Sequence, residues 1–194
     1  MTPSSVCVYC ASSSKLNPVY FRMASDLGAI LATNQIECIY GAGNQGLMGA
    51  LADSVLEHGG RVKGVIPKFM HDEGWGHDHL TDLFIVETMH HRKMLMASLS
   101  DAVIALPGGC GTLEELLEII TWKQLGLYGN PIVIVNTEGY YNDLIAMLNK
   151  AIDENFMRPQ HSFMWEVVDS VDEVLSAIRR SEKWNDKPLD LAVI

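Results

Sequence analysis

Residues 102–120 read AVIALPGGCGTLEELLEII, and they constrain the fold more than any other part of the chain. Ala102–Leu106 is apolar throughout, which predicts a buried strand. After a glycine-rich turn, the leucines at 113, 116 and 117 and Ile120 recur with helical spacing, which predicts a helix whose core stripe is Leu113, Leu117 and Ile120. Such a turn leaves backbone N–H groups unpaired at the N-terminus of a helix, an arrangement that binds phosphate.

Glu115 lies close to this expected anion site, and the residues alone leave two interpretations of it open. In the first, Thr112 to Glu115 form a capping box, in which the glutamate bonds back to the N–H of the capping residue. In the second, the carboxylate faces the bound anion and takes part in chemistry. Glu115 falls on a second stripe with Ile119 and Trp122, so it need not point into the core. The glycines likewise have a purely structural explanation, because glycine allows positive φ and close packing.

The alternation of apolar runs and helical patterns continues along the chain and predicts an α/β fold. The strands are apolar on both faces, as in a parallel sheet covered by helices, with ligands bound at the carboxyl ends of the strands. We therefore expect a Rossmann-like, doubly wound parallel sheet in a single domain over residues 1–183, followed by a C-terminal tail over residues 184–194. The expected strands are Val6–Tyr9, Glu37–Tyr40, Arg61–Ile66, Leu83–Val86, Ala102–Leu106, Pro131–Val135 and Glu166–Val168, and the expected helices are Tyr20–Ala32, Leu47–His58, His91–Leu99, Leu113–Leu125, Tyr141–Asn155 and Val171–Ser181.

Composition argues against a nucleic-acid-binding, membrane-spanning or secreted protein. The chain has 194 residues, a net charge of −10 and four cysteines. An acidic chain is a poor partner for nucleic acid polymers, although local groups can still bind a small anion. We expect no membrane span and no secretory signal, and the cysteines fit reduced thiols in a cytoplasmic protein. Cys7 and Cys10 have CxxC spacing, but on a strand they face opposite sides, which argues against a redox or zinc site.

One long segment, residues 68–82, has no clear periodicity. It contains three histidines and three acids between His71 and His79. Because it offers neither a helical histidine pair nor a cysteine, we expect no metal site. We expect a solvated loop, with a lid over the ligand as the alternative.

Two more loops follow strands and are expected to reach the same edge of the sheet. Cys10–Ser14 supplies hydroxyl groups, Ser13 among them, that bond to a nucleotide or cap the next helix. Gly41–Gly49 contains a GxGxxG pattern with Gly43 as its middle glycine. The pattern follows the second strand and lacks the acid expected about 20 residues later, so a nicotinamide enzyme is disfavoured. A phosphate or ribose site there remains open.

A third segment, MHHRK at Met89–Lys93, places two cations near the start of a helix. The helix dipole disfavours positive charge at that end. Arg92 and Lys93 therefore fit a site that also holds an anion, or else they are an ordinary surface pair.

Together these motifs resemble the LOG ("lonely guy") family of cytokinin riboside 5′-monophosphate phosphoribohydrolases. The resemblance rests on MHHRK at Met89–Lys93 and on the pattern PGGxGTxxE at Pro107–Glu115, and it extends from Val6 to about Ile178. The chain differs from the common pattern at Ala11, Ala42 and Cys110. Shorter flanking matches are Gly46–Gly49, Thr121–Gly126, Asn130–Pro131 and Gly139–Tyr141.

The resemblance implies hydrolysis of the N-glycosidic bond of AMP and N6-prenyl-AMP to free base and ribose 5-phosphate, without a cofactor. It implies that Glu115 stabilises the oxocarbenium-like ribose and activates water, while Arg92 neutralises the phosphate or orients the ribose. A homodimer is expected from the resemblance and from the second apolar stripe of the helix after the PGG turn. The implied substrate-binding residues are Ser13, Gly43, Met89, Lys93, Gly108, Gly109, Gly111 and Thr112.

Two other functions fit these residues less well. The label lysine decarboxylase has often been given to such proteins, but no lysine lies in a recognisable setting for a pyridoxal phosphate Schiff base. The alternative is a protein that binds a nucleotide or the molybdenum cofactor without turnover. Arg92 together with Glu115 argues against pure binding, because holding an anion gains nothing from a nearby carboxylate.

Overall fold

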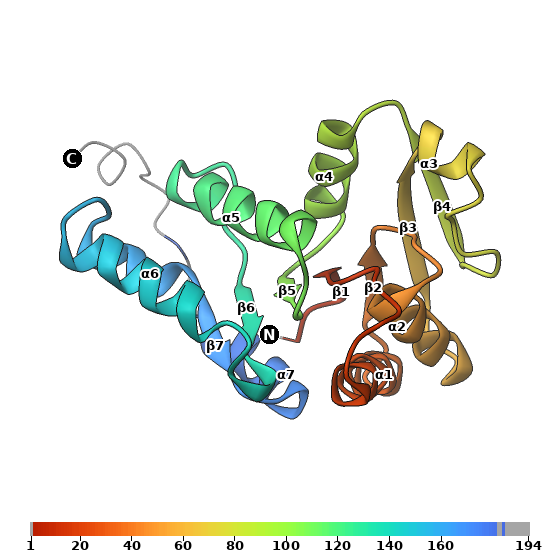
Figure 1. The fold of residues 1–194 in the computed structure, drawn as a ribbon, viewed down its shortest axis with the longest axis horizontal. Coiled ribbons are helices and arrows are strands. Elements are labelled where there is room, and N and C mark those ends of the chain that lie inside the picture. Colours follow the sequence, from red (N-terminus) through yellow and green to blue (C-terminus); the bar gives the residue numbers. More distant parts are fainter. Residues whose placement is uncertain (1, 182–183, 185–194) are drawn as a thin grey trace.

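One sheet of parallel strands organises the molecule (Figure 1). The computed structural model describes residues 2–181 and 184. The strands lie in the order β4-β3-β2-β1-β5-β6-β7, and neighbouring strands are parallel throughout. The predicted doubly wound parallel sheet is therefore confirmed. The strands are β1 (Ser5–Tyr9), β2 (Glu37–Tyr40), β3 (Val62–Pro67), β4 (Asp82–Val86), β5 (Val103–Ala105), β6 (Ile132–Val135) and β7 (Glu166–Val168).

Helices cover both faces of the sheet and bury two apolar cores (Figure 1). Helices α1, α2 and α7 pack on one face, and α4, α5 and α6 pack on the other. The helices are α1 (Pro18–Thr33), α2 (Gly46–Glu57), α3 (Lys68–Asp72), α4 (Met89–Ser98), α5 (Cys110–Gln124), α6 (Asn142–Asp153) and α7 (Val174–Arg180), with 3₁₀ turns η1 (Thr137–Gly139), η2 (Pro159–Met164) and η3 (Val171–Glu173).

The order of the strands reverses beside β1. The chain runs from β1 outward to β4 at one edge and then returns to the other side of β1 to place β5. Val8 of β1 pairs with Tyr40 of β2 on one side and with Ile104 of β5 on the other. The connections after β1 and β5 lead to helices on opposite faces, which opens a crevice at the carboxyl ends of these strands. Doubly wound folds bind their ligands at this point.

Residues 68–82 are not simply the solvated loop that we expected. The segment begins with the short helix α3, and its later part is bonded to the loop after β2. Gly43 and Gly76 form an antiparallel bridge, and the N–H of His77 donates to the carbonyl of Ala42 over 2.9 Å. These bonds hold the segment beside the carboxyl ends of β2 and β3. In the part of the chain that the structure describes, no group of three or more His, Cys, Asp or Glu side chains is placed to hold a metal ion.

Strand β4 departs from the expectation that every strand is covered on both faces. Leu83 and Ile85 are 39% and 50% exposed, while Phe84 and Val86 contact the core beneath α4. β4 is an edge strand of the sheet, and its Leu83 and Ile85 side chains are left partly uncovered on the face opposite Phe84 and Val86.

Helix α5 turns only part of its predicted apolar pattern to the core. Leu116, Ile119 and Ile120 are buried, whereas Leu117 is 40% exposed. Of the predicted core stripe, Ile120 is buried and Leu113 packs against the core, whereas the prediction for Leu117 was wrong, because α5 carries two overlapping apolar stripes and its position over the sheet selects between them. Ile119 is part of the core, so the second stripe no longer supports a homodimer.

The C-terminal end is described only in part. Trp184 packs against the core beneath α5 and α6, with its ring centroid 6.1 Å from that of His161. The rest of the predicted tail lies outside the described residues, and the domain boundary stays a prediction. Among the residues that are described, no helix combines the length and apolar character needed to cross a bilayer.

Candidate active site

Helix α5 begins at Cys110, directly after the PGG turn. Its N-cap is Gly109, and no side chain caps the helix. The capping-box interpretation of Thr112 to Glu115 was wrong, because the cap is Gly109 and not Thr112. Glu115 therefore lies in the second turn of the helix, where a capping role is not available to it.

The two glycine-rich loops differ in whether a helix N-terminus is free to bind a ligand. At α2, the N–H groups of Leu47 and Met48 both donate to the carbonyl of Ala11, over 2.9 and 3.3 Å. At α5, the N–H of Leu113 donates to the carbonyl of Gly109 over 3.0 Å. The N–H groups before Leu113 have no intrahelical acceptor, as in the first turn of any α-helix. An anion is therefore better accommodated at α5 than at α2.

The residues predicted to bind phosphate divide into two kinds. Gly109, Gly111 and Thr112 line the cavity described below, whereas Gly108 is not among its lining residues. A Cβ at position 108 would clash with the side chain of Thr112, so glycine is required there for close packing. At Gly109 and Gly111 nothing lies within 4 Å of where a Cβ would stand. The backbone at these two glycines is therefore open to a ligand.

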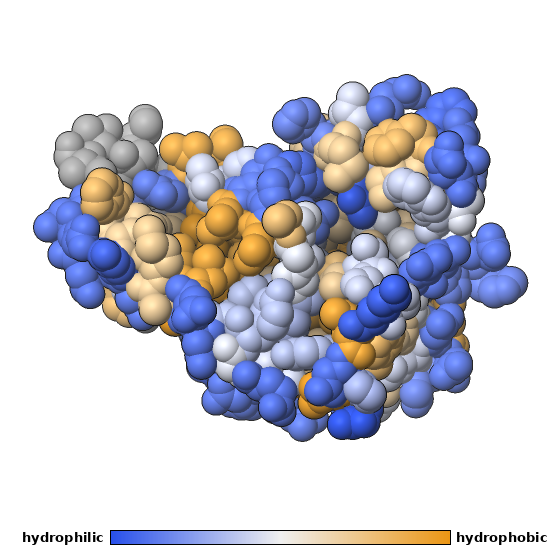
Figure 2. Space-filling view, in the orientation of Figure 1, coloured by the Kyte–Doolittle hydropathy of each residue, from blue (hydrophilic) through white to orange (hydrophobic). Residues whose placement is uncertain are grey.

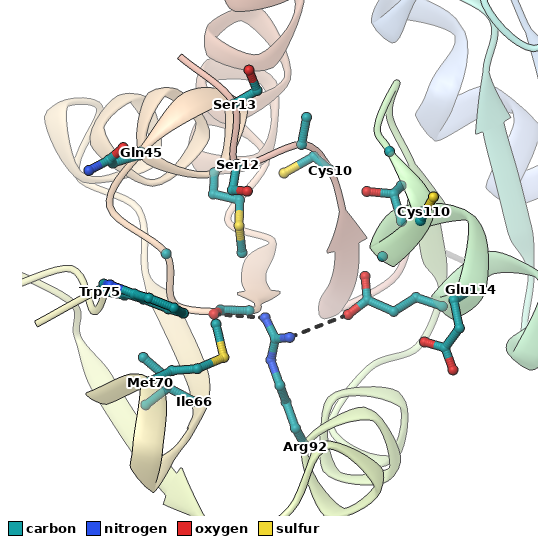
Figure 3. Close-up of a pocket in the computed structure, with 18 of the residues that line it drawn as sticks. Cys10, Ser12, Ser13, Gln45, Ile66, Met70, Trp75, Arg92, Cys110 and Glu114 are labelled. Carbon is teal, nitrogen blue, oxygen red and sulfur yellow. Dashed lines mark hydrogen bonds and ion pairs between the residues drawn. The ribbon is translucent and has the colours of Figure 1, made fainter. Parts of the chain in front are cut away.

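Arg92 is held rigidly at the floor of the crevice. Helix α4 begins at Met89, which places Arg92 in its first turn, and the side chain is buried. Its Nε donates to the carbonyl of Val65 over 3.1 Å, and its Nη2 donates to that of Gly41 over 2.9 Å. A Cβ at position 41 would overlap the guanidinium, so the approach requires glycine. The Nη1 atom lies 3.7 Å from Oε1 of Glu115 (Figure 3).

The Glu115 carboxyl group is largely buried. Its side chain is 11% exposed. Burial raises the pKa of Glu115 from 4.5 to about 7; Arg92 opposes this shift and Glu114 adds to it. A carboxyl group with a pKa near neutrality can both carry charge and accept a proton at physiological pH.

Lys93 does not reach the cavity. Its ammonium group forms ion pairs with Glu114 and with Glu118, the latter at 2.9 Å, and its side chain is 5% exposed. Lys93 therefore links α4 to two successive turns of α5. The interpretation of Arg92 and Lys93 as an ordinary surface pair was wrong, because both are buried.

A cavity of ≈ 620 Å³ lies where these groups meet, large enough for a nucleoside monophosphate. Figure 3 shows Ile66, Met70 and Trp75 on one side of Arg92 and Cys110 on the other. The lining residues are Cys10, Ala11, Ser12, Ser13, Gly41, Gly43, Asn44, Gln45, Met48, Ile66, Met70, Trp75, Met89, Arg92, Gly109, Cys110, Gly111, Thr112, Glu114 and Glu115. Of the predicted site residues, the structure thus brings Ser13, Gly43 and Met89 together with Arg92 and Glu115.

The apolar wall of this cavity was not predicted from the sequence. Ile66 ends β3, Met70 lies on α3, and Trp75 lies in the segment that bonds to the loop after β2. No motif marks these residues. The only signal was the suggestion that residues 68–82 form a lid.

Comparisons with known proteins place this arrangement in a family. Residues 48–178 match a family model described as "Possible lysine decarboxylase". The cytokinin riboside 5′-monophosphate phosphoribohydrolase LOG5 of Arabidopsis thaliana is 40% identical over 181 residues, covering 93% of this chain and 79% of that protein. The cytokinin riboside 5′-monophosphate phosphoribohydrolase of Rhodococcoides fascians is 40% identical over 179 residues, covering 92% of this chain and 90% of that protein. The chain belongs to the LOG family.

Solved structures share the LOG fold at lower identity. The molybdenum cofactor carrier protein of Chlamydomonas reinhardtii superposes with a TM-score of 0.68 at 19% identity, covering 91% of this chain and 95% of the carrier. The molybdenum cofactor binding protein of Rippkaea orientalis gives a TM-score of 0.66 at 18% identity, covering 90% and 94%. These likenesses extend to the fold alone. The MHHRK and PGGxGTxxE segments, in contrast, contribute Met89, Arg92 and Glu115 to the cavity described above.

Proposed function

We propose that this protein hydrolyses the N-glycosidic bond of purine nucleoside 5′-monophosphates and releases the free base and ribose 5-phosphate. The observation that carries the proposal is the buried pair of Arg92 and Glu115, which faces a cavity beside the open N-terminus of α5. The relatives named as phosphoribohydrolases support the same reaction.

Glu115 is the residue that acts at the reacting carbon. Departure of the base leaves positive charge on the ribose, and a carboxylate beside C1′ stabilises that charge. The same carboxylate accepts a proton from the water that attacks C1′, so that hydroxide is delivered to the sugar as the base departs. The purine nitrogen freed by cleavage takes up a proton from solvent, and Glu115 returns its proton to solvent, so that free base, ribose 5-phosphate and the starting carboxylate result. Its pKa of about 7 suits a group that must be charged at first and protonated later.

The phosphate and the ribose occupy different parts of the site. The N–H groups at the start of α5 receive the 5′-phosphate, assisted by Thr112. Along the helix Glu115 lies about 7.5 Å from Cys110, at 1.5 Å per residue, a separation that a ribose spans. Arg92 is held against Glu115 and so orients the ribose. Lys93 is engaged by two carboxylates and positions α5 without touching substrate.

The apolar wall fits the base and a substituent on it. Ile66, Met70 and Trp75 present hydrophobic surface to the cavity opposite α5, and Met89 extends it. Such a wall accommodates an adenine ring and the isopentenyl group of N6-prenyl-AMP. AMP and N6-prenyl-AMP are therefore the proposed substrates.

A single assay tests the function. The protein is incubated separately with AMP, isopentenyl-AMP and adenosine, and released base is separated by chromatography. We expect base from both nucleotides and far less from adenosine, because binding of the remote phosphate positions C1′ against Glu115. Activity should survive EDTA, since the proposed transition state needs no Lewis acid.

Two outcomes of that assay would contradict the proposal. Tight nucleotide binding with no release of base would favour the binding-protein alternative. Equal turnover of adenosine and AMP would show that the enzyme does not recognise the 5′-phosphate.

The cavity does not fit a lysine decarboxylase. An enzyme of that class that uses pyridoxal phosphate needs a lysine for the Schiff base, and the described residues place none in the cavity wall.

We also propose a homodimer in the cytoplasm. Exposed apolar side chains gather over α5 and α6 (Figure 2), Leu117 and Met147 among them at 40% and 61% exposure. Apolar surface of this kind commonly marks an interface between subunits. The four cysteines are unpaired, and three of them are buried, which fits a reducing compartment.

A further inference from the structure

Two adjacent tyrosines after β6 contact the PGG turn on the side away from the cavity. The hydroxyl of Tyr140 donates to the carbonyl of Gly108 over 2.7 Å, and the hydroxyl of Tyr141 donates to that of Leu106 over 2.7 Å. These two carbonyls flank Pro107 in the PGG turn. Neither tyrosine is among the residues that line the cavity.

The carbonyl between them is also engaged. The N–H of Ala11 donates to the carbonyl of Pro107 over 3.3 Å, so three consecutive carbonyls of the turn have donors within the protein. The peptide unit is planar and trans, so each carbonyl points opposite to the N–H that follows it. Holding the carbonyl of Gly108 toward Tyr140 therefore directs the N–H of Gly109 the other way. The partial negative charges of the carbonyls are kept from an anion in the cavity.

The tyrosine pair is itself fixed in place. Oδ1 of Asn136 accepts a bond from the N–H of Tyr141 over 2.7 Å, and the Asn136 amide donates to Asn142 over 2.9 Å. The rings of Tyr140 and Tyr141 meet edge to face with centroids 5.0 Å apart, and Tyr140 meets Tyr20 in the same way at 6.0 Å. Burial raises the pKa of Tyr141, so its hydroxyl stays a donor at any physiological pH.

We propose that Tyr140 and Tyr141 are positioning residues for the substrate's 5′-phosphate. The Tyr140 hydroxyl holds the carbonyl of Gly108 so that the N–H of Gly109, at the start of α5, faces the phosphate. The Tyr141 hydroxyl holds the carbonyl of Leu106 away from the cavity; the peptide unit of that carbonyl ends in Pro107 and has no N–H, so Tyr141 acts by fixing the turn. The inference rests on the proposed function, because it assigns the tyrosines to the phosphate end of the substrate. It makes them determinants of the preference for a phosphorylated substrate, although they touch neither substrate nor reacting atoms.

The test removes one hydroxyl at a time. Tyr140→Phe and Tyr141→Phe are compared with the wild type and with Tyr20→Phe, which removes a hydroxyl from the same aromatic cluster and leaves both bonds to the turn intact. Calorimetry measures the binding of ribose 5-phosphate and of adenine, and thermal unfolding measures stability. We expect Tyr140→Phe and Tyr141→Phe each to bind ribose 5-phosphate roughly three- to tenfold more weakly than the wild type, as for one lost hydrogen bond. Their affinity for adenine should not change, and Tyr20→Phe should bind both ligands like the wild type. The ratio of kcat/KM for AMP to that for adenosine should fall in parallel.

The inference depends on whether the tyrosine variants lose affinity for ribose 5-phosphate but not for adenine. Equal weakening of ribose 5-phosphate and adenine would mean that the tyrosines support the fold in general and would overturn the inference. Unchanged binding of ribose 5-phosphate to both variants, or no binding of it to the wild type, would also overturn it. Tyr140 is 45% exposed, so Tyr140→Phe remains informative if loss of the buried Tyr141 hydroxyl impairs folding. Hydrolysis of AMP by the wild type tests the proposed function separately, whichever of these results is obtained.

Discussion

At the scale of single residues, Glu115 carries the strongest prediction. Glu115→Gln keeps the size and polarity of the side chain and removes the negative charge that a cationic ribose needs. We expect kcat for AMP to fall by about 10²-fold or more, with AMP binding and the fold retained. Steady-state kinetics and calorimetry on the same preparation measure both quantities.

The neighbouring glutamate provides the control for this substitution. Glu114 also lines the cavity but is 55% exposed and is paired with Lys93. Glu114→Gln should cost less activity than Glu115→Gln. Near-normal hydrolysis by both variants would show that the proposed mechanism is wrong. An inactive Glu114→Gln with an active Glu115→Gln would show that Glu114, and not Glu115, has the catalytic role.

The raised pKa of Glu115 predicts the pH dependence of the reaction. Its carboxylate must be ionised before the base leaves, and its pKa is about 7. We expect kcat/KM for AMP to rise about tenfold per pH unit below pH 7 and to level off above it. In Glu115→Gln this limb should be absent from the residual activity. A flat wild-type profile between pH 5 and pH 8 would contradict the assignment of Glu115 to this limb.

The same shift makes a separate prediction for stability. Because the pKa of Glu115 is higher in the folded protein than its ordinary value of 4.5, the unfolded chain binds fewer protons between pH 4.5 and pH 7. Stability therefore falls as pH rises through this window. Glu115→Gln lacks the titrating group, so its Tm relative to the wild type should increase from pH 4.5 to pH 7 and then stay constant. A difference in Tm that does not change with pH would mean that the group is not buried in this way.

At the scale of elements, Lys93 is the link that fixes α5 relative to α4. Lys93→Met removes a buried ammonium group and breaks its ion pairs with Glu114 and Glu118. We expect a loss of about 1–3 kcal/mol in the free energy of unfolding, less than for a fully buried pair because Glu114 is well solvated. Lys93 lowers the pKa of Glu115 while both glutamates raise it, so the acid limb of activity should move to higher pH. Chemical denaturation and pH profiles check these two effects.

A second lysine in an exposed ion pair is the matched control. Lys150 pairs with Glu154 at 3.6 Å on the surface of α6, where both side chains are more than half exposed. Lys150→Met should change neither stability nor the pH profile, since exposed pairs contribute little. If Lys93→Met behaved in the same way, the link between α4 and α5 would be incidental.

Most elements could be predicted from sequence because each has its own local pattern. Continuous apolar runs gave the strands to within one or two residues, and the helix at Tyr20–Ala32 is found as Pro18–Thr33. Helix α3 was missed because a five-residue helix in a polar segment has no periodicity to detect. Leu117 of α5 was wrongly predicted to be buried for a different reason. The helix has two apolar stripes of similar hydrophobicity, and the packing of α5 on the sheet determines which side chains are buried.

The site could be predicted where a backbone motif or a charge marks it. The PGG turn, Arg92 and Glu115 are marked in this way, and the structure brings them to one cavity. Ile66, Met70 and Trp75 are ordinary apolar residues, and only the chain path beside β3 makes them neighbours of the site. The orientation of Lys93 away from the cavity depends on Glu114 and Glu118, which belong to another helix.

At the scale of the whole molecule, the exposed apolar surface over α5 and α6 predicts association. We expect light scattering at micromolar concentration to give the mass of a dimer, twice the 21.5 kDa of the chain. Leu117→Glu places a charge on this surface without entering the core and should shift the mass toward that of a monomer. Arg179→Glu, a change at an exposed residue of α7 on the opposite face of the sheet, is the control. A wild-type monomer at these concentrations would contradict the proposal.

Cys110 has a practical consequence for chemical labelling. Of the four cysteines, Cys7, Cys10 and Cys38 are buried, and burial raises the pKa of all three thiols, whereas Cys110 is exposed. Cys110 also lines the cavity at the first residue of α5. A mild electrophile such as iodoacetamide should therefore alkylate one thiol in the native protein, and a bound nucleotide should slow that reaction. Occupancy of the cavity can then be followed by mass spectrometry without any turnover, and a nucleotide analogue that carries an electrophile near its phosphate end becomes an irreversible ligand for this cavity.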